Sequence, residues 1–278
     1  MKHVARAFAP GNISCLFAVC PHKDPAKMGS LGLGFTINKG ATVSVRTATK
    51  TAVFFNGKPI NFPTILYVIK ALSDQPLSVA IRTPLPLGSG FGLSGASALA
   101  TAYAINELLG LRISRINLAR VAHTAEVVSK TGLGDVVNQY FGGCFVKFTS
   151  SAKFTVQRLP VKGTLYCKSY DRLPTPKVLG DAKRVELINI AGRWVLTAIK
   201  KDLHAKKHLA LADILGYAKE FATTSGLLTS AKLLDTIYSI KKRGGHASMI
   251  MLGNAIMSDI PFPESMKLSI STTPAHVS

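Results

Sequence analysis

The stretch PLGSGFGLSGASALATAYAINELLG, residues 86–110, is the most informative part of this chain. Four glycines, Gly88, Gly90, Gly92 and Gly95, fall within eight positions and lead directly into an alanine-rich apolar segment. The segment predicts a helix, and amides without side chains can approach phosphate oxygens at the positive end of a helix dipole. The pattern therefore favours a phosphate-binding loop. The alternative is a tight connection in which the glycines only permit close packing.

Three better known glycine motifs do not fit this loop. Residues 90–95, GFGLSG, satisfy G-x-G-x-x-G, but the segment after the helix is another helix, so no strand carries the acidic residue of a dinucleotide site. A Walker A loop needs Gly-Lys-Ser/Thr at its end, whereas this loop ends in Gly-Ala-Ser. The nucleophile elbow G-x-S-x-G fails because Ala96 stands at its last glycine.

Composition and charge limit the classes of function. The 278 residues suit one large domain or two moderate ones, and 34 Lys and Arg against 14 Asp and Glu give a formal charge of +20. The basic residues are scattered and not interleaved with aromatic ones, which favours a solvated surface over nucleic-acid binding. The four cysteines fit no zinc spacing, and the apolar run at 13–20 is too short for a secretory signal or a membrane span. We expect a cytoplasmic protein with no membrane partner.

The remaining pattern alternates strands and helices, which predicts an α+β fold. In the first part of the chain, strands are expected at residues 2–9, 41–48, 77–83 and 144–148, and helices at 61–72, after the glycine loop, and from the N-cap Ser114 onward. Pro160, Pro174 and Pro176 mark a looser stretch in which we place a domain boundary. Beyond it, helices are expected at residues 206–222 and 230–242, followed by a last strand at 266–271.

Three blocks of this sequence, taken in order, resemble the motifs of the GHMP kinases. Residues 86–96 resemble the second motif, residues 7–17, AFAPGNISCLF, resemble the N-terminal motif, and residues 244–254, GGHASMIMLGN, lie where the C-terminal glycine motif belongs. Within that superfamily the sequence is most similar to archaeal pantoate kinases, through blocks such as CPHKDPAKMGSLGLGF at 20–35 and TGLGDVVNQYFGG at 131–143. The resemblance covers nearly the whole chain.

The resemblance implies a two-domain GHMP kinase fold. Residues 1–160 would form an N-terminal domain like domain 2 of ribosomal protein S5, with the ATP-binding loop and the catalytic residues, and residues 161–278 a ferredoxin-like C-terminal domain. The implied activity is ATP-dependent phosphorylation of (R)-pantoate to (R)-4-phosphopantoate in coenzyme A biosynthesis, with ATP and Mg²⁺ as cofactors. No nucleic acid is expected as a partner, and the sequence is compatible with a homodimer.

Two alternatives stay open at this point. A GHMP kinase acting on homoserine or mevalonate would share the catalytic residues and differ in the acceptor loop. A basic nucleic-acid-binding protein would account for the charge of +20. Against the second alternative, Glu126 and Asp135 would lie near the phosphate loop and repel a nucleic-acid backbone.

The resemblance also assigns roles to individual residues. Ser94 and Glu126 match the magnesium ligands, a pair of hard oxygen donors. Asp135 matches the catalytic aspartate, although its sequence context alone favours a helix N-cap. Acceptor binding is expected at Asn12, Ser30 and Gly32. The expected ATP-binding residues are Pro86, Gly88, Ser89, Gly90, Gly92, Ser94, Gly95 and Ala96.

The chain departs from the family pattern at two positions near these residues. Many GHMP kinases have Lys, and pantoate kinases usually have His, where this chain has Asn12. A cation there would lower the pKa of Asp135, and Lys130 is a candidate replacement. The usual Ser-Ser pair of the second motif is Leu93-Ser94, which leaves one hydroxyl.

Overall fold

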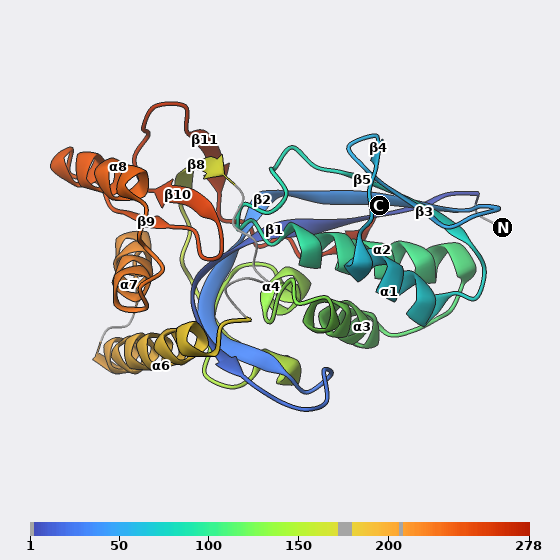
Figure 1. The fold of residues 1–278 in the computed structure, drawn as a ribbon, viewed down its shortest axis with the longest axis horizontal. Helices are drawn as coiled ribbons and strands as arrows, with labels where there is room; N and C mark the ends of the chain where they lie inside the picture. Colours follow the sequence, from blue (N-terminus) through green and yellow to red (C-terminus); the bar gives the residue numbers. More distant parts are fainter. Residues whose placement is uncertain (1–2, 172–179, 206–207) are drawn as a thin grey trace.

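The computed structural model describes residues 3–171, 180–205 and 208–278 and arranges them around two β-sheets (Figure 1). The first sheet has the order β12-β1-β2-β5-β3-β4, with β6 paired to β2 and β7 paired to β6. Its strands are β1 (Ala5–Cys20), β2 (Gly29–Thr47), β3 (Ala52–Phe55), β4 (Lys58–Pro59), β5 (Leu77–Arg82), β6 (Cys144–Lys147), β7 (Gln157–Leu159) and β12 (His276–Val277). The predicted α+β class is confirmed.

The helices of the first part lie together on one side of the first sheet (Figure 1). They are α1 (Pro63–Leu72), α2 (Leu93–Leu109), α3 (Arg115–Val128) and α4 (Asp135–Phe141). Helix α2 packs against β1, β2, α1 and α3. Its small and apolar residues are buried on every side as far as Ile105, as expected for a helix inside a core. Glycines in the left-handed conformation flank it at both ends, Gly92 at φ 60° and Gly110 at φ 63°, because other residues adopt this conformation at a cost.

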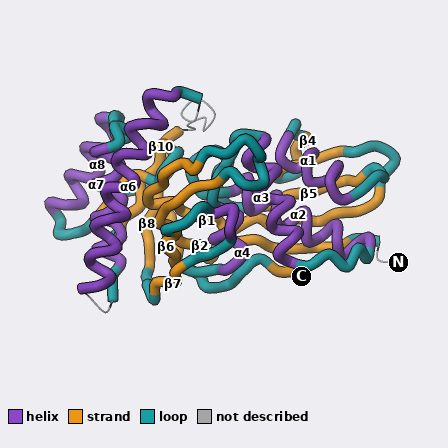
Figure 2. The backbone as a smooth tube through the Cα atoms, turned by 90° about the horizontal axis from the view of Figure 1, so that it is seen from below, coloured by secondary structure: helices purple, strands orange, loops and turns teal. Residues whose placement is uncertain are grey.

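Strands β1 and β2 form a long antiparallel ribbon that runs from the end of the molecule near the N-terminus to its middle, where it curves beside α6 (Figures 1 and 2). The strand predicted at residues 2–9 is therefore correct but much too short. Pro10 and Gly11, which look like a turn in the sequence, lie inside β1, where the pairing shifts register between Pro10 and Asn12 and again between Ser14 and Leu16. Such bulges bend a strand and redirect its side chains. Asn12 and Ser14 lie in this irregular part, on the strand that crosses the centre of the fold.

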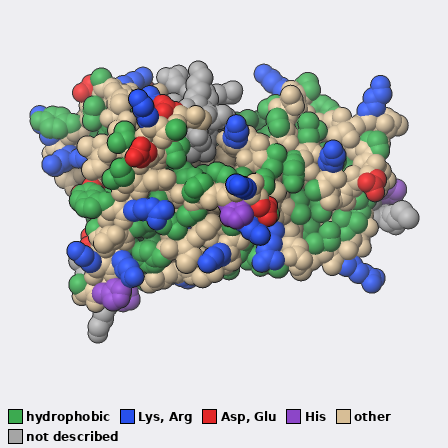
Figure 3. Space-filling view, turned by 60° about the horizontal axis from the view of Figure 1, so that its bottom comes forward, with side chains coloured by type: hydrophobic (Ala, Val, Ile, Leu, Met, Phe, Trp, Pro, Cys, Tyr) green, Lys and Arg blue, Asp and Glu red, His purple; other side chains and the backbone are tan. Residues whose placement is uncertain are grey.

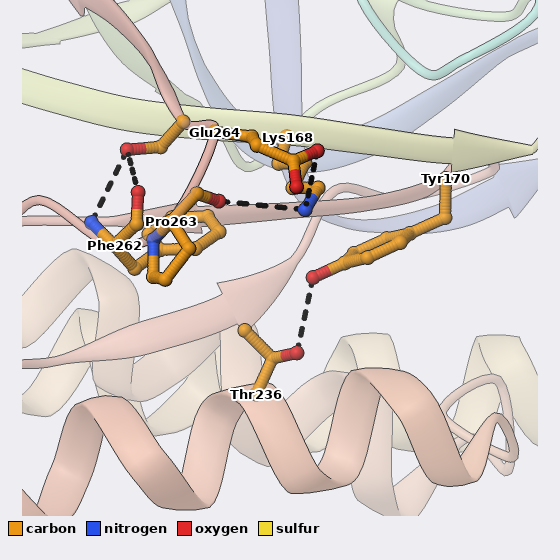
Figure 4. Close-up of polar contacts among 7 residues, drawn as sticks. Lys168, Tyr170, Thr236, Phe262, Pro263 and Glu264 are labelled. Atoms are coloured by element: carbon orange, nitrogen blue, oxygen red, sulfur yellow. Dashed lines mark hydrogen bonds and ion pairs between the residues drawn. The ribbon is translucent and has the colours of Figure 1, made fainter.

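The second sheet has the order β11-β8-β10-β9 and is antiparallel. Its strands are β8 (Thr164–Asp171), β9 (Ala247–Met249), β10 (Asn254–Ser258) and β11 (Met266–Ser269), and helices α6 (Ala182–Ala205), α7 (Leu211–Thr224) and α8 (Ala231–Lys242) gather at this end of the molecule (Figure 2). Figure 4 shows how β8 meets its surroundings: the Tyr170 hydroxyl lies 3.0 Å from that of Thr236 in α8, and Lys168 Nζ lies 3.1 Å from Glu264.

Helix α6 is the longest element that the sequence analysis missed. Its 24 residues include β-branched side chains, which lower helix propensity, and Gly192 interrupts the pattern. The glycine is needed because a Cβ at this position would lie 2.3 Å from the Phe17 carbonyl oxygen. The Val19 amide donates to Asn189 Oδ1 at 2.6 Å, so α6 is held directly on the end of β1. The predicted helices at 206–222 and 230–242 correspond to α7 and α8, whereas residues 206–207 lie outside the described part.

The last residues of the chain return to the first sheet. Strand β12 pairs with β1, so that Val277 lies opposite Ala7 and His276 opposite Phe8. The Ser278 amide donates to the Arg6 carbonyl at 2.9 Å. The predicted boundary between residues 160 and 161 separates β7 of the first sheet from β8 of the second. It also places β12 in the C-terminal domain, although β12 pairs with β1 of the first sheet. The boundary stays a proposal, with the C-terminal domain ending near the end of β11.

Charge on the surface is distributed much as the composition suggested. Figure 3 shows Lys and Arg side chains scattered over the visible face and only a few acidic ones between them. Within the described residues, no helix is both long enough and apolar enough to cross a membrane.

Candidate active site

Strands β1 and β2 and helices α2 and α4 converge near the middle of the fold (Figure 1). Residues from these elements line a cleft, together with Met251 and Leu252 of the turn between β9 and β10. Many of the residues predicted from the sequence line it: Gly88, Gly90, Gly92, Ser94, Ser30, Gly32 and Asp135. Others are buried and do not line it: Asn12, Ser89, Gly95, Ala96 and Glu126. Pro86 is exposed at the start of the loop. The two distant motifs at 7–17 and 131–143 thus meet the glycine loop in space.

The glycine loop follows a backbone path that its residue types permit. Gly88, Gly90 and Gly92 have φ values of 81°, 85° and 60°, in the left-handed region that favours glycine. A Cβ at Gly90 would lie 2.7 Å from the Ile250 side chain, so the loop is packed tightly on the second sheet. Ser169 of β8 donates a hydrogen bond to Ser89 Oγ at 2.8 Å. The loop that we expect to bind phosphate is therefore held in place by both halves of the chain.

Ser94 and Glu126, the predicted magnesium ligands, lie on either side of Thr131. The Ser94 hydroxyl donates to Thr131 Oγ1 at 3.0 Å, and Thr131 Oγ1 lies 3.4 Å from Glu126 Oε1. The Glu126 side chain is fully buried in α3, and its second oxygen, Oε2, has no hydrogen-bond partner among the described residues. A buried carboxylate oxygen without a hydrogen-bond partner costs free energy. Such an oxygen is therefore unusual in a folded protein unless a ligand binds to it.

The electrostatics of Glu126 are those of a site that a cation would stabilise. Burial raises the pKa of Glu126 well above its usual value, and the nearby charge of Asp135 raises it further, while hydrogen bonds from Ser94 and Thr131 oppose the shift. A divalent ion beside Glu126 would favour its ionised form. Carboxylate and hydroxyl oxygens are donors that suit Mg²⁺, so these residues fit the ion that the family pattern implies.

Asp135 is the first residue of α4 and has a different set of partners. Its Oδ1 accepts hydrogen bonds from Asn12 Nδ2 at 2.6 Å and from the Ser14 hydroxyl at 3.0 Å. Burial raises the pKa of Asp135, while the charge of Lys147 and these two hydrogen bonds lower it. The Asp135 side chain lines the cleft. Among the described residues no hydrogen bond to its Oδ2 is found, so that oxygen is available to a ligand.

Lys147 is a candidate site residue that the sequence analysis did not identify. It ends β6, its side chain is buried, and it lines the cleft. Its Nζ donates to the Gly134 carbonyl at 3.1 Å and to Asn138 Oδ1 at 2.9 Å. Burial lowers its pKa to about 8, opposed by the charge of Asp135. A lysine inside the otherwise apolar strand CFVK was the signal available in the sequence. Lys130 is exposed and does not line the cleft.

The two glycines of the Thr131–Gly134 loop are explained by polar side chains that approach the backbone. A Cβ at Gly132 would lie 2.6 Å from Glu126 Oε2. A Cβ at Gly134 would lie 2.6 Å from the Ser30 hydroxyl and 3.2 Å from Lys147 Nζ. Ser30 and Lys147 are thus neighbours on one side of the loop, and Glu126 lies on the other.

Asn12 and Gly32, both expected to bind the acceptor, are placed differently from Ser30. The Asn12 side chain is fully buried and does not line the cleft. It is occupied by Asp135, Ser14 and Asn138, which donates to Asn12 Oδ1 at 2.9 Å. Gly32 lines the cleft, and a Cβ there would lie 2.5 Å from the Leu16 carbonyl oxygen, so the residue permits the close approach of β1 and β2.

Comparison with known proteins places this site in a family. The model of the GHMP kinases N terminal domain matches residues 62–143, which include the glycine loop, Glu126 and Asp135. The chain is 31% identical over 255 residues to the pantoate kinase of Methanocaldococcus jannaschii, with 90% of each chain covered. This chain belongs to the pantoate kinase family.

Other pantoate kinases and a solved structure agree. The pantoate kinase of Thermococcus kodakarensis is 31% identical over 286 residues, covering 94% of this chain and 89% of that one. A solved structure described as a phosphotransferase related to the CoA biosynthesis pathway is 28% identical, with a TM-score of 0.83 and coverage of 99% of this chain and 98% of that chain. The GHMP kinase fold expected from the sequence is therefore confirmed.

Proposed function

We propose that this chain transfers the γ-phosphoryl group of ATP to the primary C4 hydroxyl of (R)-pantoate and releases (R)-4-phosphopantoate and ADP. The observation that carries the proposal is the presence of one buried ammonium, Lys147, and one carboxylate, Asp135, in a cleft that also contains the glycine loop. An anionic hydroxy acid needs a cation for its carboxylate and a base or orienting group for its hydroxyl.

The nucleotide half of the site would consist of the glycine loop and the pair Ser94 and Glu126. Backbone amides at the start of α2 are suited to the phosphates of ATP, because they combine free N–H groups with the positive end of the helix. Ser94 and Glu126 would hold Mg²⁺ through their oxygens. The ion supplies neutralisation of the charge that develops on the phosphoryl oxygens during transfer.

The acceptor half would lie between Ser30, Lys147 and the apolar residues of β1 and β2. Lys147 uses two of its three N–H donors on Gly134 and Asn138, which leaves one for a ligand carboxylate. The Ser30 hydroxyl lies on the same side of Gly134 and can donate a second hydrogen bond. The geminal methyl groups of pantoate would contact the apolar lining, which is formed by Leu16, Phe17, Leu31 and Leu33.

In the proposed reaction Asp135 orients and deprotonates the acceptor. Its Oδ1 is held by Asn12 and Ser14, so Oδ2 faces the hydroxyl. A bond forms between the acceptor oxygen and the γ-phosphorus as the bond from that phosphorus to the β,γ-bridging oxygen breaks. The hydroxyl proton passes to Asp135, and ADP leaves with the electron pair of the broken bond.

The experiment is a panel of acceptors. Purified protein with ATP and Mg²⁺ is offered pantoate, pantothenate, homoserine, mevalonate and shikimate in parallel, and ADP release is measured. Pantoate should give the highest kcat/KM by at least about tenfold, because all five acceptors carry a carboxylate but differ in its distance from the reacting hydroxyl or in the apolar groups between the two. A lead by homoserine or mevalonate would keep the kinase and exclude pantoate as the substrate. No stimulation by any acceptor would contradict the proposal.

A second measurement isolates the carboxylate contact. The neutral analogue in which a CH₂OH group replaces the pantoate carboxylate keeps the reacting hydroxyl and both methyl groups. It should lose about two to three orders of magnitude in kcat/KM, because Lys147 and Ser30 would remain unpaired in the complex. A loss below about threefold would place the acceptor carboxylate somewhere other than beside Lys147.

A further inference from the structure

Asp135 is connected to Lys147 by a continuous row of hydrogen bonds through two asparagines. Lys147 Nζ donates to Asn138 Oδ1 at 2.9 Å, Asn138 Nδ2 donates to Asn12 Oδ1 at 2.9 Å, and Asn12 Nδ2 donates to Asp135 Oδ1 at 2.6 Å. The side chains of Lys147, Asn138 and Asn12 are 4%, 0% and 0% exposed. The row therefore runs from β6 through α4 and β1 back to Asp135 in α4, with its two asparagines fully buried and its two charged ends at the cleft.

The chemistry of the two ends fixes the direction of the row. An ammonium group has donors and no acceptor, and an ionised carboxylate has acceptors and no donor. The oxygen of Asn138 must therefore face Lys147, and the nitrogen of Asn12 must face Asp135. Each amide in between both accepts and donates, so the two bonds can polarise one another in the same sense. Exchange of Lys147 for a neutral residue would remove the group that sets this direction.

The surroundings of the asparagines leave little room for other orientations. A Cβ at Gly34 would lie 2.9 Å from Asn138 Nδ2, and a Cβ at Gly92 would lie 3.0 Å from Asn12 Cβ. Glycine at both positions thus allows the amides to fit against the backbone. The backbone N–H of Asn12 also donates to the Phe91 carbonyl at 2.9 Å, which ties the same residue to the glycine loop.

We propose that Asn12 and Asn138 are positioning residues that link the Lys147 ammonium to Asp135, keep Asp135 ionised and leave its Oδ2 free for the acceptor hydroxyl. The role rests on the proposed kinase function. It also accounts for an asparagine at residue 12, where the family resemblance leads one to expect a cation. The positive charge is that of Lys147 in β6, and the two asparagine amides connect it to Asp135 by hydrogen bonds. Neither asparagine needs to touch the acceptor.

The decisive variant is Asn138→Leu, which keeps a similar volume and removes the middle of the row. Charged groups that face Asp135 are Lys147 from β6 and Glu126 from α3, and the variant changes neither. The link between Lys147 and Asp135 can be tested without an acceptor by following the ¹³C signal of the Asp135 carboxyl against pH in the magnesium-free protein. The signal is assigned by its loss in Asp135→Asn. The midpoint should rise by about one pH unit, as expected when a hydrogen bond to the ionised form is weakened.

Kinetics with the best acceptor of the panel give a second readout. Asn138→Leu should lower kcat by about tenfold or more and change KM for ATP by less than about threefold, because only the transition-state role of Asp135 is weakened. The double variant Asn138→Ala with Asn12→His places a ring donor beside Asp135 and should recover part of the loss relative to Asn138→Ala. A purely structural asparagine would not be rescued in this way.

The matched control is Asn189→Leu. This substitution also removes a side-chain amide, the one that accepts the 2.6 Å hydrogen bond from the Val19 backbone N–H. Asn189 is far from Asp135 in the sequence and does not line the cleft. It should lower thermal stability without moving the Asp135 midpoint. Should Asn138→Leu fail to fold, the smaller Asn138→Ala is measured in its place.

The outcomes separate this inference from the proposed function. An Asp135 midpoint that moves only in the Asn138 variants supports the link, even if pantoate proves to be the wrong acceptor. A midpoint unchanged in the Asn138 variants, with kcat within about twofold of the unaltered protein, would overturn the link while leaving the kinase proposal intact. An equal shift in Asn189→Leu would overturn it as well, because the effect would then follow stability.

Discussion

Glu126 and Asp135 are both carboxylates at one cleft, separated by the short loop that begins at Thr131, but their hydrogen-bond partners differ. Oδ1 of Asp135 receives two strong donors, and Lys147 adds a positive charge nearby. Glu126 has a long contact of 3.4 Å to Thr131 at Oε1 and no partner at Oε2 among the described residues. Burial raises both pKa values, but only Asp135 has a nearby cation in the chain to oppose it.

The difference separates two tasks that both require an acid side chain. A carboxylate whose donors come from the protein is positioned before any ligand arrives, as a group that orients a substrate hydroxyl must be. A buried carboxylate with an unpartnered oxygen is stabilised either by a proton or by a cation from solution, and a cation favours its ionised form. In this cleft the protein itself supplies the hydrogen-bond donors to Asp135, whereas one oxygen of Glu126 has no partner among the described residues.

The largest expected effect comes from Asp135→Asn, which keeps the shape and the hydrogen bond from Ser14 but removes the base. We expect kcat to fall by about 10²- to 10⁴-fold while ATP affinity changes little. Single-turnover phosphorylation and equilibrium binding of an ATP analogue measure the two quantities. A fall below tenfold would mean that positioning of the reactants dominates and that Asp135 chiefly begins α4.

The next largest effect is expected from Lys147, the positively charged residue near Asp135. Lys147→Met should raise KM for the acceptor and lower kcat/KM by about 10²-fold, because the acceptor carboxylate loses its charged partner inside a buried site. KM for ATP should change far less. Lys147→Arg, which keeps the charge, is the matched control and should retain more of the activity than Lys147→Met; if the two variants were equally impaired, charge would not be the reason.

The pKa of Lys147 gives the same comparison a pH dependence. With a pKa of about 8, the side chain is charged below that pH and becomes neutral above it. Binding of an anionic acceptor should therefore weaken as the pH rises through about 8, and the kcat/KM profile, which reports the free enzyme, should fall on its alkaline side. Lys147→Arg should move this fall to higher pH. A flat profile between pH 7 and 10 would remove Lys147 from acceptor binding.

Glu126→Gln tests the incomplete carboxylate. The substitution keeps the helix and one oxygen donor but removes the charge, so the Mg²⁺ concentration for half-maximal activity should rise by about tenfold. Saturating Mg²⁺ should restore a substantial part of the rate. Identical magnesium dependence in the variant and the parent would show that Glu126 serves only the packing of α3.

The smallest effect is expected from Gly95→Ala. A Cβ at Gly95 would lie 2.7 Å from Glu126 Oε2 and 2.8 Å from Gln139 Oε1, so the carboxylate would have to move. The magnesium requirement should rise by a few-fold, in the direction of Glu126→Gln but less, as expected for a displaced ligand. Gly216→Ala in α7 is the matched control, because nothing lies within 4 Å of its added methyl group. A response equal in both variants would exclude an effect through Glu126.

Much of this site was predictable from the sequence because its residues belong to local patterns. The glycine loop before an apolar helix, the acid in the apolar helix α3 and the aspartate after Gly134 each have a chemical reason visible within a few positions. Their association in one cleft could be expected only from the family resemblance, since nothing local brings residues 12, 94 and 135 together.

Other features depended on distant contacts and were missed. Lys147 is placed in the site by hydrogen bonds to Asn138 and Gly134, which lie in and just before α4. Helix α6 is stabilised by packing on β1, although its own helix propensity is modest. The burial of Asn12 follows from the register shifts in β1, which a pattern of alternating residues does not reveal. In each of these cases tertiary packing overrides the local signal.

The pairing of β12 with β1 has a consequence for the order in which the protein can form. Strand β1 is synthesised well before its edge partner, His276–Val277, which follows it at a large separation in the sequence. Contacts between segments far apart in the sequence close slowly, because the entropy of the intervening segment opposes them. The first sheet is therefore completed only after residues 276 and 277 have been synthesised, and nascent chains halted before residue 276 should be more sensitive to proteases than chains that include these residues.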